Sequence, residues 1–368
     1  MRVGIRVNAS SDIGLGHVMR CMTLAEMLQK WCRAKIHFWI NDDAPATIVD
    51  DLSARGFKVI FIPGEASASL YERSADRIQD QASKQIYDAW ACIAGLQGVD
   101  ELELIVVDHY ELGEQWEIQL LPSCRKLMVI DDLANRRHCC HILLDQNLAP
   151  DMELRYQGLV PETCVKLLGP AYTLLRSSFF EYRSEVRFRH DCCHILVNFG
   201  GSDPTNETEK VIAAIRSGGS RFDHIRFSIV AGQANIRQQE IAKMCQPLDH
   251  VTYYSRHNDM AGLLASVDVA IGAGGISLWE RAFMGVPALV VSVAANQTEA
   301  VLEAERLGMV WHLGASEVVS EGTVLSALEQ LLNDRTQIKE KSLKCLEVMQ
   351  PLINKGIHPI LSVIEKNA

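Results

Sequence analysis

A short apolar run that passes through glycines into a helix-like stretch constrains this chain more than any other feature. Residues 267–271 have the composition of a buried strand, and residues 276–284 have helical spacing. Gly272, Gly274 and Gly275 lie between them. Such a unit gathers backbone N–H groups at a helix N-terminus, where the helix dipole adds partial positive charge. The stretch therefore predicts either a phosphate-binding turn or an ordinary tight turn of a parallel α/β sheet.

The amino-terminal part of the chain contains a second unit of this kind. Residues 2–7 form an apolar strand pattern, and residues 17–28 have helical spacing. Gly14 and Gly16 lie in the loop between them. Glycine has no Cβ, so this loop can also bring its backbone close to a ligand.

Two polar side chains follow this loop, and they suggest chemistry. His17 and Arg20 are three residues apart and therefore share one face of the first helical turn. Histidine titrates near neutral pH and suits a general base, and a helix N-terminus disfavours its protonated form. The alternative is a histidine that caps the helix or packs in the wall of a cleft.

A third unit starts at residues 195–199 and continues into Gly201 and Ser202. Pro204 then predicts a helix start, with Asp203 or Ser202 as the cap. The sequence thus places glycine-bearing turns after predicted strands in both halves of the chain.

Strand-like and helix-like stretches alternate along the rest of the sequence. Further strands are predicted at residues 35–40, 57–62, 103–107, 127–130, 141–144, 227–230, 251–254 and 288–293. Further helices are predicted at residues 44–54, within 71–96, and at 116–121, 236–244, 259–266, 296–307, 317–332 and 338–364.

The length of the chain and a charged stretch at residues 181–191 predict two domains. We expect a first domain at residues 1–185, a second at 192–345, and a carboxyl-terminal helix at 346–368 that packs back on the first domain. The predicted fold class is α/β, with two Rossmann-like βαβ domains facing a cleft. We expect the ligand in that cleft.

Composition excludes several classes of protein. The formal charge of −10 argues against nucleic-acid or membrane-surface binding. The sequence has no signal-peptide core and no apolar run of the ~20 residues that a membrane span needs. We therefore expect a cytoplasmic protein without membrane insertion, and we expect it to be a monomer.

The cysteines and histidines do not predict a metal site. The 11 cysteines include no Cys-x-x-Cys pair, which is typical of free thiols in a reducing compartment. The clusters at residues 138–141 and 190–194 lack the usual zinc spacing, so we interpret them as buried or strand-entry residues. There is also no Asp-x-Asp triplet, Gly-x-Gly-x-x-Gly at the first turn, or Walker motif, which disfavours metal-dependent, NAD or ATP chemistry. We expect no cofactor.

Polar side chains follow several predicted strands, where ligands bind in open α/β folds. Asp108, Tyr110 and Gln146 are candidates of this kind. Asp131 and Asp132 also occur at a strand end, but a turn-forming role is favoured for both.

A group of motifs, in order along most of the chain, resembles the UDP-sugar hydrolases of pseudaminic acid biosynthesis. The motifs are Arg6-x-Asn8-x-Ser10, Ile13-Gly14-x-Gly16-His17-x-x-Arg20-Cys21, Asp108-His109-Tyr110, Asp131-Asp132-Leu133, Leu144-Asp145-Gln146-Asn147, Phe199-Gly200-Gly201-Ser202-Asp203, residues 272–280 and Asn296-Gln297. Asn8, His141 and Asn198 depart from residues common in that family. The resemblance implies a GT-B fold, which the peptidoglycan N-acetylglucosaminyltransferase shares.

The resemblance also implies a reaction and a set of site residues. Water would attack the anomeric carbon of a UDP-linked 2,4-diacetamido-2,4,6-trideoxyhexose with inversion, and His17 would be the catalytic base. Glu280 would bind the ribose hydroxyls, and Met260 would lie near the uracil. The remaining substrate-binding candidates are Gly14, Gly16, Arg20, Asp108, Tyr110, Gly201, Ser202, Gly274, Gly275, Ile276, Ser277, Asn296 and Gln297.

Two other functions stay open at this stage. One is a GT-B glycosyltransferase that passes an N-acetylated sugar from UDP to an acceptor. The other is a non-catalytic protein that binds a nucleotide sugar. Glu280 could equally be a solvated helix residue and Asn296 a helix cap.

Overall fold

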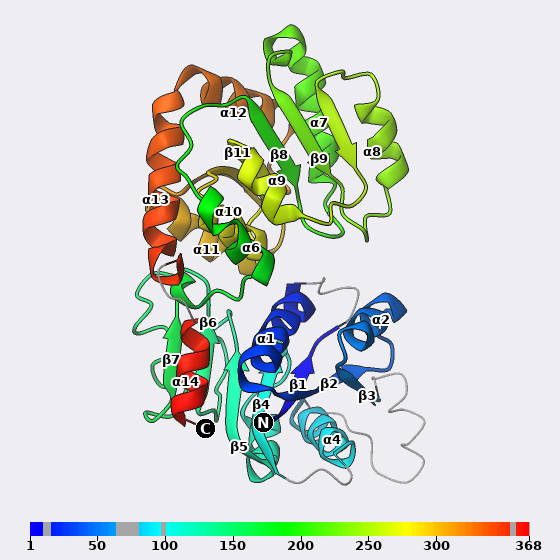
Figure 1. Cartoon of the computed structure of the whole chain (residues 1–368), viewed down its shortest axis with the longest axis vertical. Helices are drawn as coiled ribbons and strands as arrows, with labels where there is room; N and C mark the ends of the chain where they lie inside the picture. Colours follow the sequence, from blue (N-terminus) through cyan, green and yellow to red (C-terminus); the bar gives the residue numbers. More distant parts are fainter. Residues whose placement is uncertain (10–15, 64–80, 97–100, 354–357, 368) are drawn as a thin grey trace. The chain divides into compact units, whose positions relative to one another are not determined.

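The computed structural model describes residues 1–9, 16–63, 81–96, 101–353 and 358–367 (Figure 1). The chain divides into two compact units. The first unit comprises Met1–Asn147, Asp151–Leu174 and Gly356–Ala368, and the second comprises Leu148–Pro150 and Leu175–Lys355. The division lies at Leu174, before the charged stretch that the sequence suggests as a linker. Leu175 and Phe179 pack in the core of the second unit, which is why the boundary comes earlier.

The first unit contains a seven-stranded parallel sheet in the order β3-β2-β1-β4-β5-β6-β7. Its strands are β1 (Arg2–Val7), β2 (Lys35–Asn41), β3 (Lys58–Ile62), β4 (Leu102–Asp108), β5 (Cys124–Ile130), β6 (Ile142–Asp145) and β7 (Val165–Leu168). Its helices are α1 (Gly16–Cys32), α2 (Ala46–Ala54), α4 (Gln81–Ala94), α5 (Glu114–Leu120) and α14 (Pro359–Asn367), with 3₁₀ turns at Leu121–Ser123 and Pro170–Tyr172.

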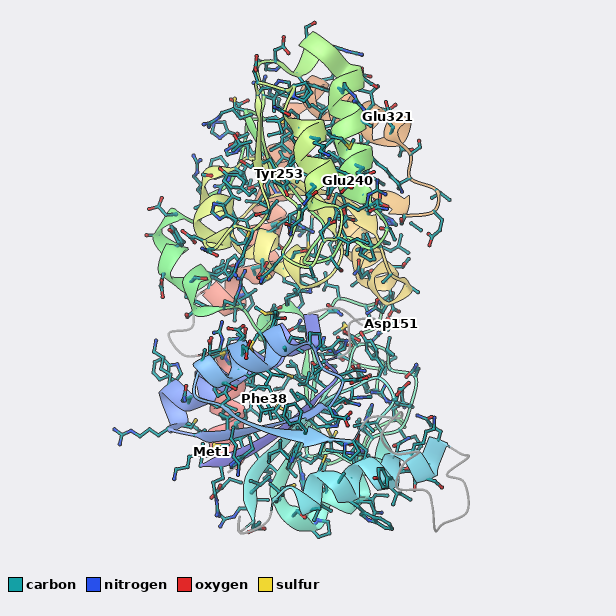
Figure 2. The ribbon with its side chains drawn as sticks, turned by 90° about the vertical axis from the view of Figure 1, so that its right-hand side faces the viewer. Met1, Phe38, Asp151, Glu240, Tyr253 and Glu321 are labelled. Carbon is teal, nitrogen blue, oxygen red and sulfur yellow. The ribbon has the colours of Figure 1, made fainter. Side chains whose placement is uncertain are left out.

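Alternating side chains divide this sheet between two cores. Phe38, labelled in Figure 2, packs with α1, α2 and α14 on one face. Its neighbour Trp39 packs with α4 and α5 on the other face. A parallel sheet covered on both faces needs such continuous apolar strands. The prediction of an α/β unit with parallel strands is confirmed.

The sequence predicts one long helix at the carboxyl-terminal end, but the structure contains two, α13 and α14. The continuous helix predicted over residues 338–364 is wrong, because α13 ends at Ile353 and α14 begins at Pro359. Proline favours the first turn of a helix, where no intrahelical N–H bond is lost. Ile360, Leu361 and Ile364 of α14 pack in the core of the first unit.

His358 attaches α14 to the first unit. Its Nε2 lies 2.8 Å from the carbonyl oxygen of Thr173, and its Nδ1 accepts the N–H of Ile360 at 3.3 Å. This pair of bonds requires a neutral ring, with the proton on Nε2. Burial lowers the pKa of His358 to about 4, although the bond to Thr173 opposes the shift.

We therefore expect stability to fall in mild acid. An unfolded histidine has a pKa of about 6.5, so between about pH 6.5 and 4 only the unfolded chain binds this proton. Because proton uptake favours the unfolded state, the free energy of unfolding should drop by up to about 3 kcal/mol as the pH falls through this window. Urea unfolding at several pH values measures the effect, and His358→Gln should show a smaller drop. His224→Gln, which alters an exposed histidine, is the control. An equal pH dependence in wild type and His358→Gln would contradict the prediction.

The second unit contains a six-stranded parallel sheet in the order β10-β9-β8-β11-β12-β13. Its strands are β8 (His194–Asn198), β9 (Arg226–Val230), β10 (Val251–Tyr254), β11 (Val269–Ala273), β12 (Ala288–Ser292) and β13 (Val310–Ala315). Its helices are α6 (Ser177–Glu181), α7 (Glu207–Gly218), α8 (Gln238–Cys245), α9 (Met260–Ser266), α10 (Ile276–Phe283), α11 (Ala295–Arg306), α12 (Glu321–Asn333) and α13 (Arg335–Ile353), with 3₁₀ turns at Tyr182–Glu185 and Gly219–Phe222.

This sheet is also covered on both faces. The helices α7, α8 and α12 contribute to one core, and α6, α9, α10, α11 and α13 contribute to the other. Figure 2 labels Glu240 on α8, Tyr253 on β10 and Glu321 at the start of α12. Within the described residues, no helix is both long enough and apolar enough to span a bilayer.

The strand order locates the edge at which ligands bind. In each sheet the order reverses between two central strands, β1 and β4 in the first unit and β8 and β11 in the second. Ligands of open α/β folds bind beyond the carboxyl ends of the strands at this reversal. The predicted glycine turns follow β1, β8 and β11, and Asp108 is the last residue of β4.

Candidate active site

His17, Asp108 and Arg20 form a buried cluster at the strand reversal of the first unit. His17 and Arg20 lie in the first turns of α1, and Asp108 ends β4. His17 Nδ1 lies 2.5 Å from Asp108 Oδ1. Arg20 donates to both oxygens of the same carboxylate, at 2.6 Å each. The three side chains are almost completely buried.

Arg20 determines the charge of this cluster. Burial alone would raise the pKa of Asp108, but the charge of Arg20, together with His17, lowers it well below its ordinary value. An anionic Asp108 can only accept, so the short contact places a proton on His17 Nδ1. Arg20 Nη2 also lies 3.1 Å from Nδ1, but as a second donor it cannot bond there, and both groups converge on Asp108 Oδ1 instead.

In the neutral ring, this arrangement leaves His17 Nε2 as the unprotonated nitrogen. No hydrogen-bond partner of Nε2 occurs among the described residues. A carboxylate that fixes the tautomer of a histidine prepares the other nitrogen to accept a proton. This geometry suits a general base, and it also disfavours the alternative of a histidine that only caps α1.

Asp108 and Arg20 are both predicted to bind substrate, and the structure gives both of them partners within the protein. Asp108 has no exposed surface, and Arg20 also donates to Asp132 Oδ2 at 2.9 Å. Their polar atoms are therefore used inside the protein, and both residues orient His17.

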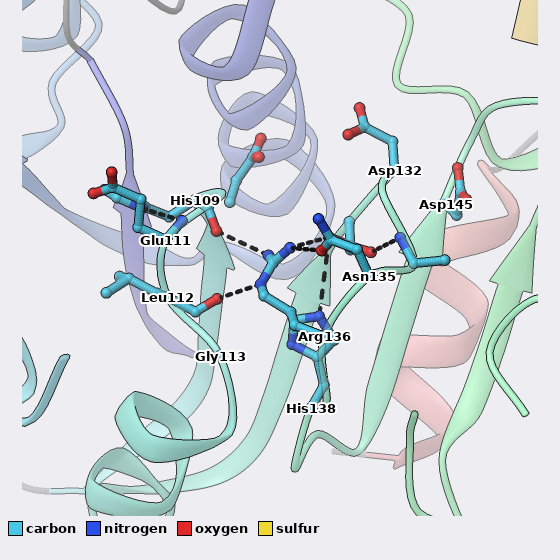
Figure 3. A network of polar contacts seen from close by, with 12 residues as sticks. His109, Glu111, Leu112, Gly113, Asp132, Asn135, Arg136, His138 and Asp145 are labelled. Carbon is cyan, nitrogen blue, oxygen red and sulfur yellow. Dashed lines mark hydrogen bonds and ion pairs between the residues drawn. The ribbon is translucent and has the colours of Figure 1, made fainter. Parts of the chain in front are cut away.

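Tyr110 contacts the same histidine from a loop whose residues His109, Glu111 and Leu112 are labelled in Figure 3. The rings of Tyr110 and His17 are perpendicular, with centroids 4.6 Å apart. Arg136 donates to the carbonyl oxygens of Leu112 at 2.8 Å and His109 at 3.0 Å, which holds the loop carrying Tyr110. Tyr110 thus remains a candidate for substrate contact.

The other polar residues at this edge stabilise the fold. Asp131 Oδ2 accepts the N–H of Ala134 at 2.8 Å, so the turn-forming role predicted for Asp131 is confirmed. Gln146 is buried and accepts the N–H of Leu174 at 3.1 Å, which does not fit a ligand role. Gly16 begins α1, whereas Gly14 lies outside the described residues.

The histidine and cysteine clusters also have structural partners. His138 Nδ1 lies 2.6 Å from Glu117 Oε1, and His141 Nδ1 accepts the N–H of Leu127 at 3.0 Å. His194 Nε2 lies 2.8 Å from Ser228 Oγ. In the parts of the chain that the structure describes, no group of three or more His, Cys, Asp or Glu side chains is placed to hold a metal.

The glycine turn of the second unit leads into an uncapped helix. β11 ends at Ala273, and α10 begins at Ile276 after Gly275. Gly275 is extended, and no side chain caps α10. The N–H of Leu278 donates to the carbonyl oxygen of Gly275 at 2.9 Å. The N–H groups of Ile276 and Ser277 precede it in the first turn and can bind an anion.

The turn between β8 and α7 differs. Asp203 accepts the N–H groups of Glu207 at 3.0 Å and Thr208 at 2.9 Å, so the N-terminus of α7 already holds a carboxylate. The prediction of a helix start near Pro204 is wrong, because the helix begins at Glu207. An anion is therefore less favourable here than at α10. Gly201 and Ser202 stay predictions as ligand contacts.

Gln297 supports the glycine turn from α11. Its Oε1 accepts the N–H groups of Gly274 at 3.1 Å and Val293 at 3.4 Å. Gln297 Nε2 has no hydrogen-bond partner among the described residues, so the substrate-binding role of Gln297 stays a prediction. Asn296 is exposed and does not cap α11, whose N-cap residue is Ala294.

A small pocket lies beside this turn. It brings together Met260, Ser277 and Glu280, three residues predicted to bind the nucleotide. The complete lining consists of Leu196, Asn198, Met260, Leu264, Ala270, Ile271, Ser277, Glu280 and Arg281.

Two arginines next to Glu280, in space or in sequence, are not predicted from the sequence. Arg176, just before α6, donates to Glu280 Oε1 at 2.9 Å and lies over the ring of Phe179. Arg281 lies in α10, directly after Glu280, and is buried. Arg281 follows Ser277 by four residues and so shares its face of α10, whereas Arg176 belongs to no spacing pattern.

No protein-family model matches the chain. It is 27% identical to the spore coat polysaccharide biosynthesis protein SpsG of Bacillus subtilis over 338 residues, which cover 90% of this chain and 89% of that protein. It is 23% identical to the UDP-2,4-diacetamido-2,4,6-trideoxy-beta-L-altropyranose hydrolase of Campylobacter jejuni over 265 residues, or 72% of this chain and 81% of that protein.

Solved structures match the whole chain at lower identity. MurG of Acinetobacter baumannii has a TM-score of 0.64 at 13% identity and covers 99% of both chains. TcCGT1 in complex with UDP has a TM-score of 0.66 at 12% identity, and the UDP-GlcNAc 2-epimerase of Neisseria meningitidis has a TM-score of 0.59 at 12% identity. Each of these two matches covers 100% of this chain and 99% of the other. The chain has the two-domain α/β fold of the GT-B glycosyltransferases, as predicted.

Proposed function

We propose that this protein, acting in the cytoplasm, hydrolyses a UDP-linked 2,4-diacetamido-2,4,6-trideoxyhexose to UDP and the free sugar. The reaction would serve pseudaminic acid biosynthesis. The observation that carries this proposal is the buried Asp108 carboxylate on His17 Nδ1, which leaves Nε2 as a base. The similarity to the Campylobacter jejuni hydrolase supports the choice of substrate.

The proposed chemistry of the first unit is activation of water. His17 Nε2 takes a proton as the water oxygen attacks the anomeric carbon from the face opposite UDP, so the configuration inverts. Asp108 stabilises the imidazolium that forms, because it is already anionic. General-base catalysis of this kind contributes ~100- to 10,000-fold.

The proposed chemistry of the second unit is stabilisation of the leaving group. The bond between the anomeric carbon and the β-phosphate oxygen breaks, and the electron pair leaves with UDP. The uncapped N–H groups of α10 and the Ser277 hydroxyl would bind the diphosphate, where negative charge develops. Gly275 keeps a Cβ out of this approach.

One incubation separates hydrolysis from the alternatives. The protein is mixed with the UDP-sugar and EDTA, without an acceptor, and UDP is quantified over time. We expect steady release of UDP. Turnover that requires an added acceptor would indicate a glycosyltransferase, and binding without turnover in any mixture would indicate a non-catalytic protein. Either result would refute the proposal.

We also expect Glu280→Gln to weaken UDP binding, because a neutral amide binds the ribose hydroxyls less well than a carboxylate. A carboxylate accepts from both ribose hydroxyls, and hydrogen bonds to charged groups are worth enough to give a loss of ~10- to 100-fold. Calorimetry with UDP and 2′-deoxy-UDP measures this, and the preference for UDP should shrink in the variant. Glu317→Gln, at an exposed position, is the control. An undiminished preference for UDP over 2′-deoxy-UDP would contradict the ribose role.

A further inference from the structure

Arg281 is a buried cation directly behind the glycine turn. It is only 3% exposed, and its Nη2 donates to the carbonyl oxygen of Ala273 at 2.6 Å. Its Nη1 donates to Ser277 Oγ at 3.2 Å. Within the described residues its Nε has no hydrogen-bond partner. Arg281 also lines the pocket that contains Ser277 and Glu280.

This cation has no carboxylate of its own. No ion pair among the described residues includes Arg281, and the adjacent Glu280 pairs with Arg176. Burial lowers the pKa of Arg281 to about 10, although Glu280 opposes the shift, so the side chain remains charged at neutral pH. An uncompensated buried charge is costly, and the cost falls when an anion binds nearby.

The backbone of the turn lies directly against the guanidinium. A Cβ at Gly272 would lie 2.7 Å from Arg281 Nη1 and 2.3 Å from the carbonyl oxygen of Asn198, so a larger residue does not fit. The bond from Arg281 fixes the direction of the Ala273 carbonyl. A fixed carbonyl cannot turn toward an anion and repel it.

Arg281 also prepares the hydroxyl of Ser277. Because Oγ accepts from Arg281, its own hydrogen must point elsewhere. The hydroxyl donates to the carbonyl oxygen of Ala273 at the long distance of 3.5 Å, and that oxygen also accepts from Arg281. This weak bond can be exchanged for a shorter one to a ligand oxygen.

We infer that Arg281 is a positioning residue for the diphosphate, which acts through Ala273 and Ser277 and adds positive charge behind the N-terminus of α10. This inference rests on the proposed function. The inference goes beyond the proposed function because it assigns the preference for a diphosphate over an uncharged nucleoside to one buried side chain. A purely structural arginine would affect both ligands alike.

Binding of UDP and of uridine tests the inference. We expect Arg281→Met to weaken UDP binding ~10- to 100-fold, which is the usual effect of losing charge-assisted hydrogen bonds. The affinity for uridine should not change. Arg281→Lys keeps the charge and should restore part of the UDP affinity. Ser277→Ala should weaken UDP binding in the wild type but have little further effect in Arg281→Met, because the two residues act together. Arg306→Met, an exposed arginine on α11, is the control.

The outcomes separate the inference from the function on which it rests. An equal loss of UDP and uridine affinity, or UDP affinity unchanged in Arg281→Met, would overturn the inference. Wild-type protein that does not bind UDP at all would instead refute the proposed function. If Arg281→Met does not fold, as judged by circular dichroism, Arg281→Lys decides: a reduced ratio of UDP to uridine affinity supports the inference, and an unchanged ratio overturns it.

Discussion

His17→Asn is expected to keep UDP binding and to lose ~100- to 10,000-fold of its turnover. Asparagine can still bond to Asp108, but it provides no nitrogen that accepts a proton from water. The diphosphate contacts are assigned to the second unit, so the dissociation constant for UDP should not change. The rate of UDP release under saturating substrate and the calorimetric affinity for UDP measure the two quantities separately.

The control for this variant is His224→Asn, which alters an exposed histidine and should retain full turnover. His17→Ala should resemble His17→Asn in turnover. A rate near that of the wild type in either His17 variant would eliminate the general-base assignment, whatever the affinity for UDP.

Asp108 is expected to affect both stability and turnover. In Asp108→Ala the buried Arg20 keeps Asp132 as its one ion-pair partner among the described residues, and removing one member of a buried ion pair costs about 3–5 kcal/mol. In Asp108→Asn the side chain keeps its shape but offers an N–H where His17 needs an acceptor. The proton then shifts to Nε2, and turnover should fall by ~1,000- to 10,000-fold, as in other carboxylate–histidine pairs.

The two Asp108 variants should therefore differ in a defined way. Urea unfolding should show a much larger loss for Asp108→Ala than for Asp108→Asn, whereas both should lose turnover. Asp151→Asn, at an exposed position of the first unit, should change neither quantity. Full turnover in Asp108→Asn would contradict the proposed orientation of His17.

The sequence patterns predict the central strands of each sheet better than the edges. β1, β4, β8 and β11 are apolar because helices cover both of their faces. The edge strands β3 and β10 are predicted, whereas β7 and β13 at the opposite edges are not, although all four pair on one side only and are largely half-buried or exposed. A short and partly polar strand has no clear periodicity to detect.

The candidate site shows a similar limit. The glycine turn and His17 could be singled out because local spacing marks a strand, a turn and a helix. The partnership of His17 with Asp108 spans 91 residues and depends on β1 lying next to β4. Arg176 bonds to Glu280 across 104 residues, and sequence spacing does not report such a contact. Arg281 has local contacts in Ser277 and Ala273, but spacing does not report its burial.

The position of labelled oxygen tests the central claim most directly. The protein is incubated with the UDP-sugar in ¹⁸O-labelled water, and both products are analysed by mass spectrometry. Water attack at the anomeric carbon predicts one ¹⁸O atom in the free sugar and none in UDP. Label in the phosphate of UDP, with none in the sugar, would show cleavage of the phosphorus–oxygen bond and would contradict the account.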